Sequence, residues 1–272
     1  MELWDQLTSS GGILKSKGEK DSSRNSDDSV ADFIWMEHDS AGEMCSTVDS
    51  GLKDLKKVLF GTGLLTPVIQ SISTALLSDH VPNEWTNKWE TGPEKPMTWV
   101  RELVRRRIAL SKWKSAVLKS TLFDSPLQLR DLFNPLTFIN ALRQQTARKL
   151  GAAIDRVHLS SSWEKDPRKL RKICPLPCQL SGLLLQGAAF PAGALRETSS
   201  DASELTPAPN VYMGFVLADD DDARSDIALA VPLYLSPSRE SLLLELHMPV
   251  SDPEDKDRWI LAGVALFLND DE

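Results

Sequence analysis

The sequence predicts an α+β fold, an N-terminal helical subdomain followed by an antiparallel, incomplete β-barrel. Apolar residues recur at helical spacings of three and four up to about residue 150, whereas short apolar runs bounded by Pro, Gly and Asp follow residue 178. No helical pattern separates those runs, which favours an antiparallel sheet or partly closed barrel over a parallel doubly wound sheet. We therefore expect a flexible tail in residues 1–30, a helical subdomain in 31–178 and a β-barrel-like subdomain in 179–272.

The N-terminal segment has the composition of a tail. Residues 9–30 combine Ser, Gly, Lys and Asp with only three branched aliphatic side chains. That apolar surface is too small to offset the entropy lost when the backbone is ordered.

Two helices are expected next, separated by Gly61 and Gly63. The first begins near Asp32 and has one apolar face, formed by Val48, Leu52, Leu55, Val58 and Leu59. The second has Thr66 as its N-cap and Pro67 at its first position. Its apolar side consists of Val68, Ile69, Ile72, Leu76 and Leu77.

A third and a fourth helix follow a loop rich in Pro and Trp. The third has an apolar face of Trp99, Leu103, Val104, Ile108 and Trp113, and a basic face of Arg101, Arg105, Arg106, Lys112 and Lys119. The fourth has Asn134 as a cap, Pro135 at its start and Gly151 as its left-handed C-terminal residue. At helical or proline-flanked positions, the tryptophans are more often packing anchors than ligand platforms.

Five apolar runs of strand length fill the C-terminal region. They are QLSGLLLQG, NVYMGFVLA, IALAVPLYLS, SLLLELHMPV and RWILAGVALFL. The acidic run Asp219 to Asp222 is most simply an exposed loop tip.

The net charge of −8 conceals a strong asymmetry along the sequence. Residues 95–178 carry a net charge of +12, and residues 179–272 carry −12. A basic block beside an acidic one fits a nucleic-acid surface, two subdomains that attract each other and a charged partner, or simply solvated helix faces and loops.

The motifs of several function classes are missing from the sequence. The spacing from Gly182 to Gly187 lacks the Lys and hydroxyl residue of a phosphate-binding loop, so ATP binding by this chain is not expected. The four histidines are scattered, and Cys174 and Cys178 do not form a zinc knuckle, so we expect no metal or cofactor. Ser181 lacks a nucleophile elbow. No apolar run is long enough to span a membrane, and the three cysteines fit a reducing compartment, so we expect a soluble intracellular protein.

Several stretches, taken in order, resemble the extreme C-terminal region of dynein heavy chains, closest to the cytoplasmic dynein 2 type. They are LKKVLFGTGLLTPVIQSISTALL, VPNEWTNKWE, WVRELVRRRIALSKW, FNPLTFINALRQQTARKLGAAID, LSGLLLQGAAF, VPLYLSPSRE and RWILAGVALFL. Together they cover about residues 31–268. Two of them, NALRQQTARKLG and LSGLLLQG, look more like the dynein 2 variant than like other dyneins.

The resemblance implies a non-catalytic domain that lies on a ring of AAA+ modules and influences the output of a minus-end-directed microtubule motor for retrograde intraflagellar transport. The resemblance also implies that the domain's partners are the AAA+ ring and other dynein subunits. Contact with microtubules would occur only through regions absent here. The implied location is the cytoplasm, the cytoskeleton and the cilium or flagellum. Because the sequence includes no AAA+ module, linker or stalk, motor activity is not expected of it alone.

We expect the basic helical block to supply an electrostatic docking surface. Its candidate residues are Arg105, Arg106, Lys112, Lys119, Arg143, Arg148 and Lys149. Their targets would be the acidic strand region or the AAA+ ring. The alternatives are a stand-alone interaction module, a nucleic-acid binder that uses the same block, and a stand-alone enzyme with an unrecognised carboxylate site.

Overall fold

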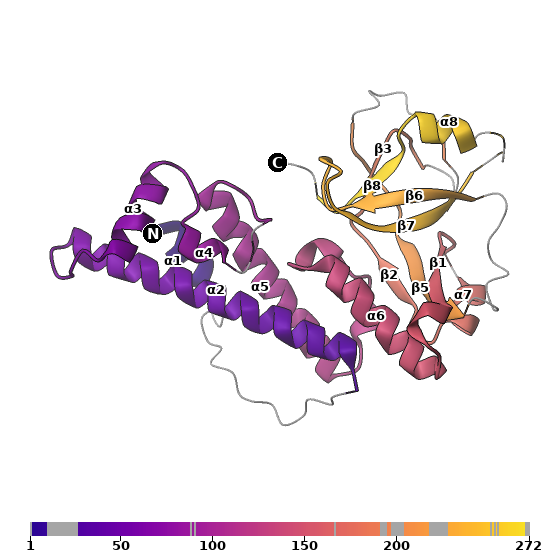
Figure 1. Cartoon of the computed structure of the whole chain (residues 1–272), viewed down its shortest axis with the longest axis horizontal. Coiled ribbons are helices and arrows are strands. Elements are labelled where there is room, and N and C mark those ends of the chain that lie inside the picture. The colour runs from indigo at the N-terminus through magenta and orange to yellow at the C-terminus, as the bar shows by residue number, and fades with distance from the viewer. Residues whose placement is uncertain are drawn as a thin grey trace. The chain divides into compact units, whose positions relative to one another are not determined.

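The structure is a computed structural model that describes residues 2–9, 27–87, 89, 91–165, 167–190, 195–196, 204–217, 228–250, 252, 254 and 256–269. Helices come first and strands follow (Figure 1), which confirms the predicted α+β class. The protein divides into two compact units. Unit 1 takes its described residues from 1–25, 31–118 and 131–133, and unit 2 from 26–30, 119–130 and 134–272.

Unit 1 is helical. Its elements are α1 (Glu2–Thr8), most of α2 (Ser29–Leu59), α3 (Pro67–Leu77), α4 (Asn83–Thr86) and α5 (Pro96–Leu118). Its core contains closely packed tryptophans, since the ring centroids of Trp85 and Trp89 lie 6.0 and 5.4 Å from that of Trp99. All three are buried, as expected of packing anchors.

Helix α1 lies within the segment that composition predicts as a flexible tail. Its Trp4 is only 4% exposed, and the indole nitrogen donates a hydrogen bond to Asp49 Oδ1 of α2 at 3.2 Å. One buried tryptophan thus supplies the apolar contact that an average over the segment conceals, and the tail prediction is wrong for residues 2–9. Residues 10–26 lie outside the described residues, and α2 already begins at Ser29.

The start of α3 follows the prediction, but its apolar face does so only in part. Thr66 Oγ1 accepts a hydrogen bond from the Ile69 amide at 3.3 Å, and Pro67 occupies the first helical position. Ile69 is buried, whereas Val68 and Leu77, predicted on the same side, are exposed. Helical periodicity identifies an apolar face, but it does not show whether anything covers that face.

Unit 2 contains one long helix, several short ones and the strands. The helical elements are η1 (Leu122–Asp124), η2 (Leu129–Asp131, whose last residue groups with unit 1), α6 (Pro135–Leu150), η3 (Ile154–Arg156), α7 (Arg168–Ile173) and α8 (Lys256–Leu261). Helix α6 ends as predicted, because Gly151 has a left-handed φ of 62°. Asn134 differs from expectation, since its side chain forms no capping hydrogen bond.

The described strands form two sheets. The three-stranded sheet has the order β1 (Val157–Ser162), β5 (Val211–Leu217), β2 (Cys178–Leu180), and the five-stranded sheet β4 (Thr206–Pro207), β3 (Leu184–Gln186), β8 (Ala265–Phe267), β6 (Ala228–Tyr234), β7 (Leu242–Pro249). All pairs are antiparallel except β6 with β8. Strand β8, which follows β7 and α8 in the sequence, runs opposite to β7 and therefore parallel to β6. The prediction of a wholly antiparallel sheet is thus wrong for this pair. No closed barrel forms among these strands.

Three of the five apolar runs form single strands, namely β5, β6 and β7. The other two are each divided at a glycine with a left-handed backbone. Gly182 (φ 73°) separates β2 from β3, and Gly263 (φ 67°) separates α8 from β8. The prediction of the last run as one strand is therefore wrong, because the apolar residues of a short helix with a buried Trp259 resemble those of a strand.

Strand β1 is not among the predicted strands, because VHLSSS has too few apolar residues to be distinguished from a loop. It lies within residues 31–178, which we predict as helical, and in the structure α6, η3, β1 and α7 group with the strands. The boundary at residue 178 stays a prediction. The acidic run Asp219 to Asp222 lies outside the described residues.

Candidate interaction surfaces

The predicted basic face of α5 is divided between its interior and its surface. Arg106 is only 6% exposed, and the neighbouring Arg107, which is not among the candidates, is 2% exposed. Lys112 is exposed, and so is Lys119, which follows the end of α5. Residues that share a charge on one helix therefore differ in what covers them.

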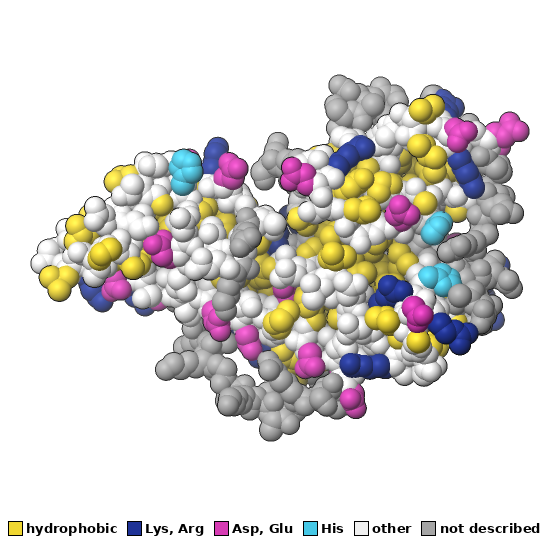
Figure 2. All heavy atoms as spheres, viewed as in Figure 1, with side chains coloured by type: hydrophobic (Ala, Val, Ile, Leu, Met, Phe, Trp, Pro, Cys, Tyr) yellow, Lys and Arg dark blue, Asp and Glu magenta, His cyan; other side chains and the backbone are white. Residues whose placement is uncertain are grey.

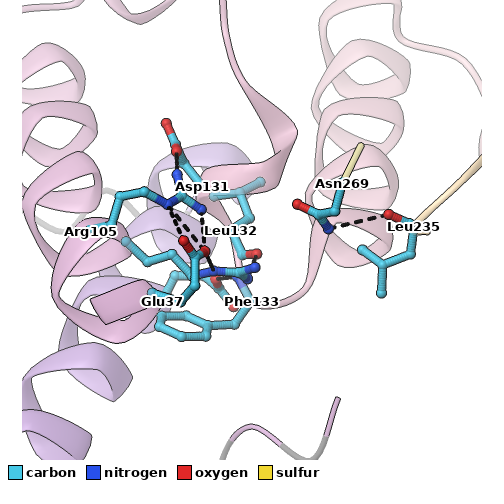
Figure 3. Close-up of polar contacts among 9 residues, drawn as sticks. Glu37, Arg105, Asp131, Leu132, Phe133, Leu235 and Asn269 are labelled. Atoms are coloured by element: carbon cyan, nitrogen blue, oxygen red, sulfur yellow. Dashed lines mark hydrogen bonds and ion pairs between the residues drawn. The ribbon is translucent and has the colours of Figure 1, made fainter. Parts of the chain in front are cut away.

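Arg106 is held in a buried polar network, near Glu37, Leu132 and Phe133, which are labelled in Figure 3. Its Nη1 donates a hydrogen bond to the carbonyl oxygen of Leu132, and its guanidinium carbon lies 4.5 Å from the ring centroid of Trp89. The carboxylate of Glu37 on α2, 1% exposed, accepts a hydrogen bond from the Phe133 amide at 2.6 Å. Residues 131–133 thus join α2 to α5 within unit 1 through one buried cation and one buried anion.

Burial lowers the pKa of Arg106 to about 10, and the nearby charge of Arg105 acts in the same direction. The carboxylates of Glu102 and Glu37 oppose this shift. Arg106 therefore stays charged near pH 7, and its charge is balanced inside the unit. This geometry removes Arg106 from any docking surface and gives it a structural role.

Arg105 is also engaged within unit 1. Its guanidinium forms ion pairs with Glu102, at 2.8 Å, and with Asp131 (Figure 3). These carboxylates raise the pKa of Arg105, against a lowering by burial. Because its charge is already compensated by two acids, Arg105 adds little to an electrostatic docking surface.

The remaining candidates lie on α6. Arg143 is half-buried, whereas Arg148 and Lys149 are exposed at the C-terminal end of the helix. Arg148 donates hydrogen bonds to the Asp27 carbonyl oxygen at 3.1 Å and to Ser29 Oγ at 2.9 Å. Of the seven candidates, Lys112, Lys119, Arg148 and Lys149 are at the surface.

Sequence reasoning missed a strongly apolar surface at the turn between α2 and α3. We call it the apolar tip, and it consists of Leu59, Phe60, Leu64, Leu65 and Val68, which are 55–86% exposed. Figure 2 shows hydrophobic side chains gathered at this end of unit 1. The available signal was the run LFGTGLL, in which large apolar residues flank the two glycines that periodicity identifies only as a break between helices.

The apolar tip has a defined backbone. Gly61 adopts a left-handed φ of 69°. The amides of Thr62 and Gly63 both donate hydrogen bonds to the carbonyl oxygen of Lys57, at 2.9 and 3.1 Å. A Cβ on Gly63 would lie 2.8 Å from the Cβ of Lys57, so the close turn needs glycine there. The tip thus presents large apolar side chains from an ordered turn, as docking surfaces do.

Two kinds of site are not found in the part of the protein that the structure describes. No three His, Cys, Asp or Glu residues there come together as metal ligands. None of the helices described is both long and apolar enough to cross a membrane.

Comparison with known proteins decides the family. The family model of the C-terminal domain of dynein heavy chains matches residues 2–268. The protein belongs to this family. It is 33% identical to cytoplasmic dynein 2 heavy chain 1 of Chlamydomonas reinhardtii, over 99% of its own length, and 32% identical to the human protein of that name, over 98%.

The family match extends to the dynein 2 type. Human dynein axonemal heavy chain 9 is 27% identical over 81% of the 272 residues, which is less than the dynein 2 heavy chains reach. The sequence is thus a C-terminal domain of a dynein heavy chain of dynein 2 type, which confirms the resemblance read from its motifs. It spans about 6% of the length of the dynein 2 heavy chains that it matches.

Proposed function

We propose that this domain works as a non-catalytic part of a dynein 2 motor, by packing on the AAA+ ring of a heavy chain and modulating the motor's output. The motor would move toward microtubule minus ends in retrograde intraflagellar transport, in the cytoplasm, the cytoskeleton and the cilium or flagellum. ATP hydrolysis and microtubule contact would belong to other regions of the heavy chain, and this domain would need no cofactor. Other dynein subunits would meet it only within the assembled complex.

The apolar tip is the observation that supports packing on the ring. Large apolar side chains gathered on a protein surface usually mark a contact with another protein. Two of the three nearby lysines are compensated, because Lys53 and Lys57 pair with Asp49 and Asp54 at 2.7 and 2.8 Å. A nearly uncharged apolar surface fits a protein partner, and in a heavy chain the nearest large partner is the rest of the same polypeptide.

Binding to the AAA+ ring tests the proposal. The 272-residue protein would be mixed with a dynein 2 ring that lacks its own C-terminal domain, and the association measured by pull-down and light scattering. Burying a leucine contributes about 1.5–3 kcal/mol, so Leu64→Ser with Leu65→Ser should weaken association at least about tenfold. Folding stability should change by less than about 0.5 kcal/mol, because both side chains are exposed.

A matched control separates the apolar tip from exposed leucines in general. Leu77 and Leu118 are 86% and 56% exposed, against 86% and 60% for Leu64 and Leu65. Leu77→Ser with Leu118→Ser should leave ring binding intact. If the wild-type protein does not associate with the ring, or if both double variants lose affinity equally, this mode of packing is rejected.

The exposed basic candidates belong to the same proposal as a secondary contribution. Charge reversal of Lys112, Lys119 and Lys149 together should lower ring affinity more at low salt than at high salt, because exposed pairs contribute only about 0 to 1 kcal/mol each. An effect independent of salt would exclude electrostatic docking through these lysines.

A further inference from the structure

A second charged surface lies in unit 2, around the short helix α7. Leu170 and Cys174 are buried against Val216 of β5, and Ile173 and Tyr212 pack beside them. These contacts hold one side of the helix to the sheet. The opposite sides carry Arg168, Lys169, Arg171 and Lys172, all exposed.

The end of α6 brings a further base to the same part of unit 2. Helices α6 and α7 both contact β1 and β5, and Lys149 is exposed in the last turn of α6. We call Lys149, Arg168, Lys169, Arg171 and Lys172 the basic cluster. Figure 2 shows Lys and Arg side chains over the side of the molecule that carries α6 and α7.

The local charge balance is strongly positive. Residues 143–173 contain nine lysines and arginines against three acidic residues, although the net charge of the whole sequence is −8. Among the described residues, Lys149, Lys169 and Lys172 have no acidic group within ion-pair distance. Within the described part of unit 2, these three charges are therefore not used in ion pairs.

We propose that the basic cluster binds a flexible acidic segment, rich in Glu and Asp, of a partner protein. The six residues of α7 span about 9 Å along the helix axis, and an extended peptide advances about 3.3 Å per residue. About three consecutive acidic residues thus match the length of the helix. Carboxylates also suit the guanidinium group of Arg171, which can bind one through two parallel hydrogen bonds.

The charge of the rest of the sequence favours a short acidic segment over a long polyanion. Residues 179–272 carry a net −12, which would repel an extended duplex or an anionic membrane. At physiological salt, charges interact over only about 8 Å, so a short peptide responds mainly to the basic cluster itself.

The aromatic side chains described near α7 argue against single-stranded nucleic acid, whose bases bind by stacking on exposed rings. Tyr212 lies beneath Arg171, whose guanidinium carbon is 5.3 Å from the ring centroid. Trp163 packs on Phe190 with a centroid distance of 5.4 Å and donates its indole hydrogen to the His247 carbonyl oxygen. Neither ring is presented to bases as an open platform.

The test is a binding titration of the 272-residue protein with a fluorescent oligoglutamate of about ten residues, long enough when extended to cross the whole cluster. The protein should bind oligoglutamate at about 50 mM salt, and the affinity should fall steeply as the salt concentration rises to about 0.5 M. Lys169→Glu with Lys172→Glu should lower the affinity by about tenfold or more, since two attractions become repulsions. An uncharged oligoglutamine of the same length should not bind.

A charge-matched variant and competing ligands decide the outcome. Lys56→Glu with Lys95→Glu changes the net charge equally at exposed lysines of unit 1 and should keep wild-type affinity. Circular dichroism of both variants verifies the fold. The proposal is overturned if oligoglutamate does not bind, if both variants lose affinity equally, or if oligothymidylate or phosphatidylserine vesicles bind the cluster more tightly than oligoglutamate. None of these results depends on the AAA+ ring, so this inference and the proposed function can fail separately.

Discussion

Replacing Arg106 by alanine should destabilise the domain strongly, although a basic residue in a long helix looks like a surface residue. The substitution would remove the buried positive charge that interacts with the carboxylates of Glu102 and Glu37, and it would leave the Leu132 carbonyl oxygen without the guanidinium donor. Breaking a buried ion pair from one side costs about 3–5 kcal/mol, and an unsatisfied buried carbonyl about 1–3 kcal/mol. These costs overlap, so we expect a loss of about 3–5 kcal/mol.

Urea unfolding followed by tryptophan fluorescence measures this effect, and Trp89 reports locally because it lies 4.5 Å from the guanidinium. With a denaturant slope of about 3 kcal/mol per molar, the midpoint should fall by more than about 1 M. Arg106→Lys keeps the charge but loses the planar donor array, and should cost less than alanine. This variant keeps the test informative if the alanine variant does not fold.

Lys112→Ala is the matched control, on the same helix but exposed, and should change stability by less than about 0.5 kcal/mol. Glu37→Gln should cost less in the Arg106→Ala background than in the wild-type protein, because the Glu37 carboxylate then no longer interacts with the Arg106 charge. The reasoning is refuted if Arg106→Ala and Lys112→Ala have the same free energy of unfolding.

Three further predictions concern buried groups. Burial, aided by nearby cations, lowers the pKa of His38 from 6.5 to about 4, so between these pH values His38 is protonated only in the unfolded state. Folding stability should therefore fall by about 2–3 kcal/mol as the pH drops through this window. His38→Asn should remove this pH dependence in urea titrations. Parallel pH profiles would contradict it. Burial raises the pKa of Cys45 to about 12 and that of Cys174 to about 11, and it raises the pKa of Cys178 as well. Ellman's reagent at about pH 8 should therefore label the three thiols only after denaturation. Rapid labelling of the native protein would show that the thiols are accessible. A Cβ on Gly214 would clash with Cys174 Sγ, so Gly214→Ala should cost about 1–3 kcal/mol of folding stability, and much less in a Cys174→Ala background. An unchanged cost would locate the strain elsewhere.

The sequence predicted those features of the fold that depend on a few neighbouring residues, namely helix ends and strands of typical length. Thr66 and Pro67 start α3, and Gly151 ends α6, because capping and a left-handed residue act within one helical turn. The apolar runs of β5, β6 and β7 are long enough to read as strands. The predictions failed for the short elements. Helix α1 depends on one buried tryptophan, and α8 is followed by a glycine that looks like an interruption within a strand.

The interaction surfaces were less predictable, because exposure depends on segments distant in the sequence. Arg106 and Lys112 are both basic residues of α5, yet Arg106 contacts Leu132, Phe133 and Trp89, while Lys112 remains in solvent. Leu59 and Val48 share one periodic pattern, but only Val48 is covered.

Motifs and local backbone preferences were enough to establish the family, the order of helices and strands, and the lack of a phosphate-binding loop in the sequence. Tertiary contacts were needed to show which charges are balanced internally, which leucines form the apolar tip, and that α7 turns its bases outward. Burial and pairing are set by contacts between residues far apart in the sequence, and periodicity along one helix holds no information about what packs against it.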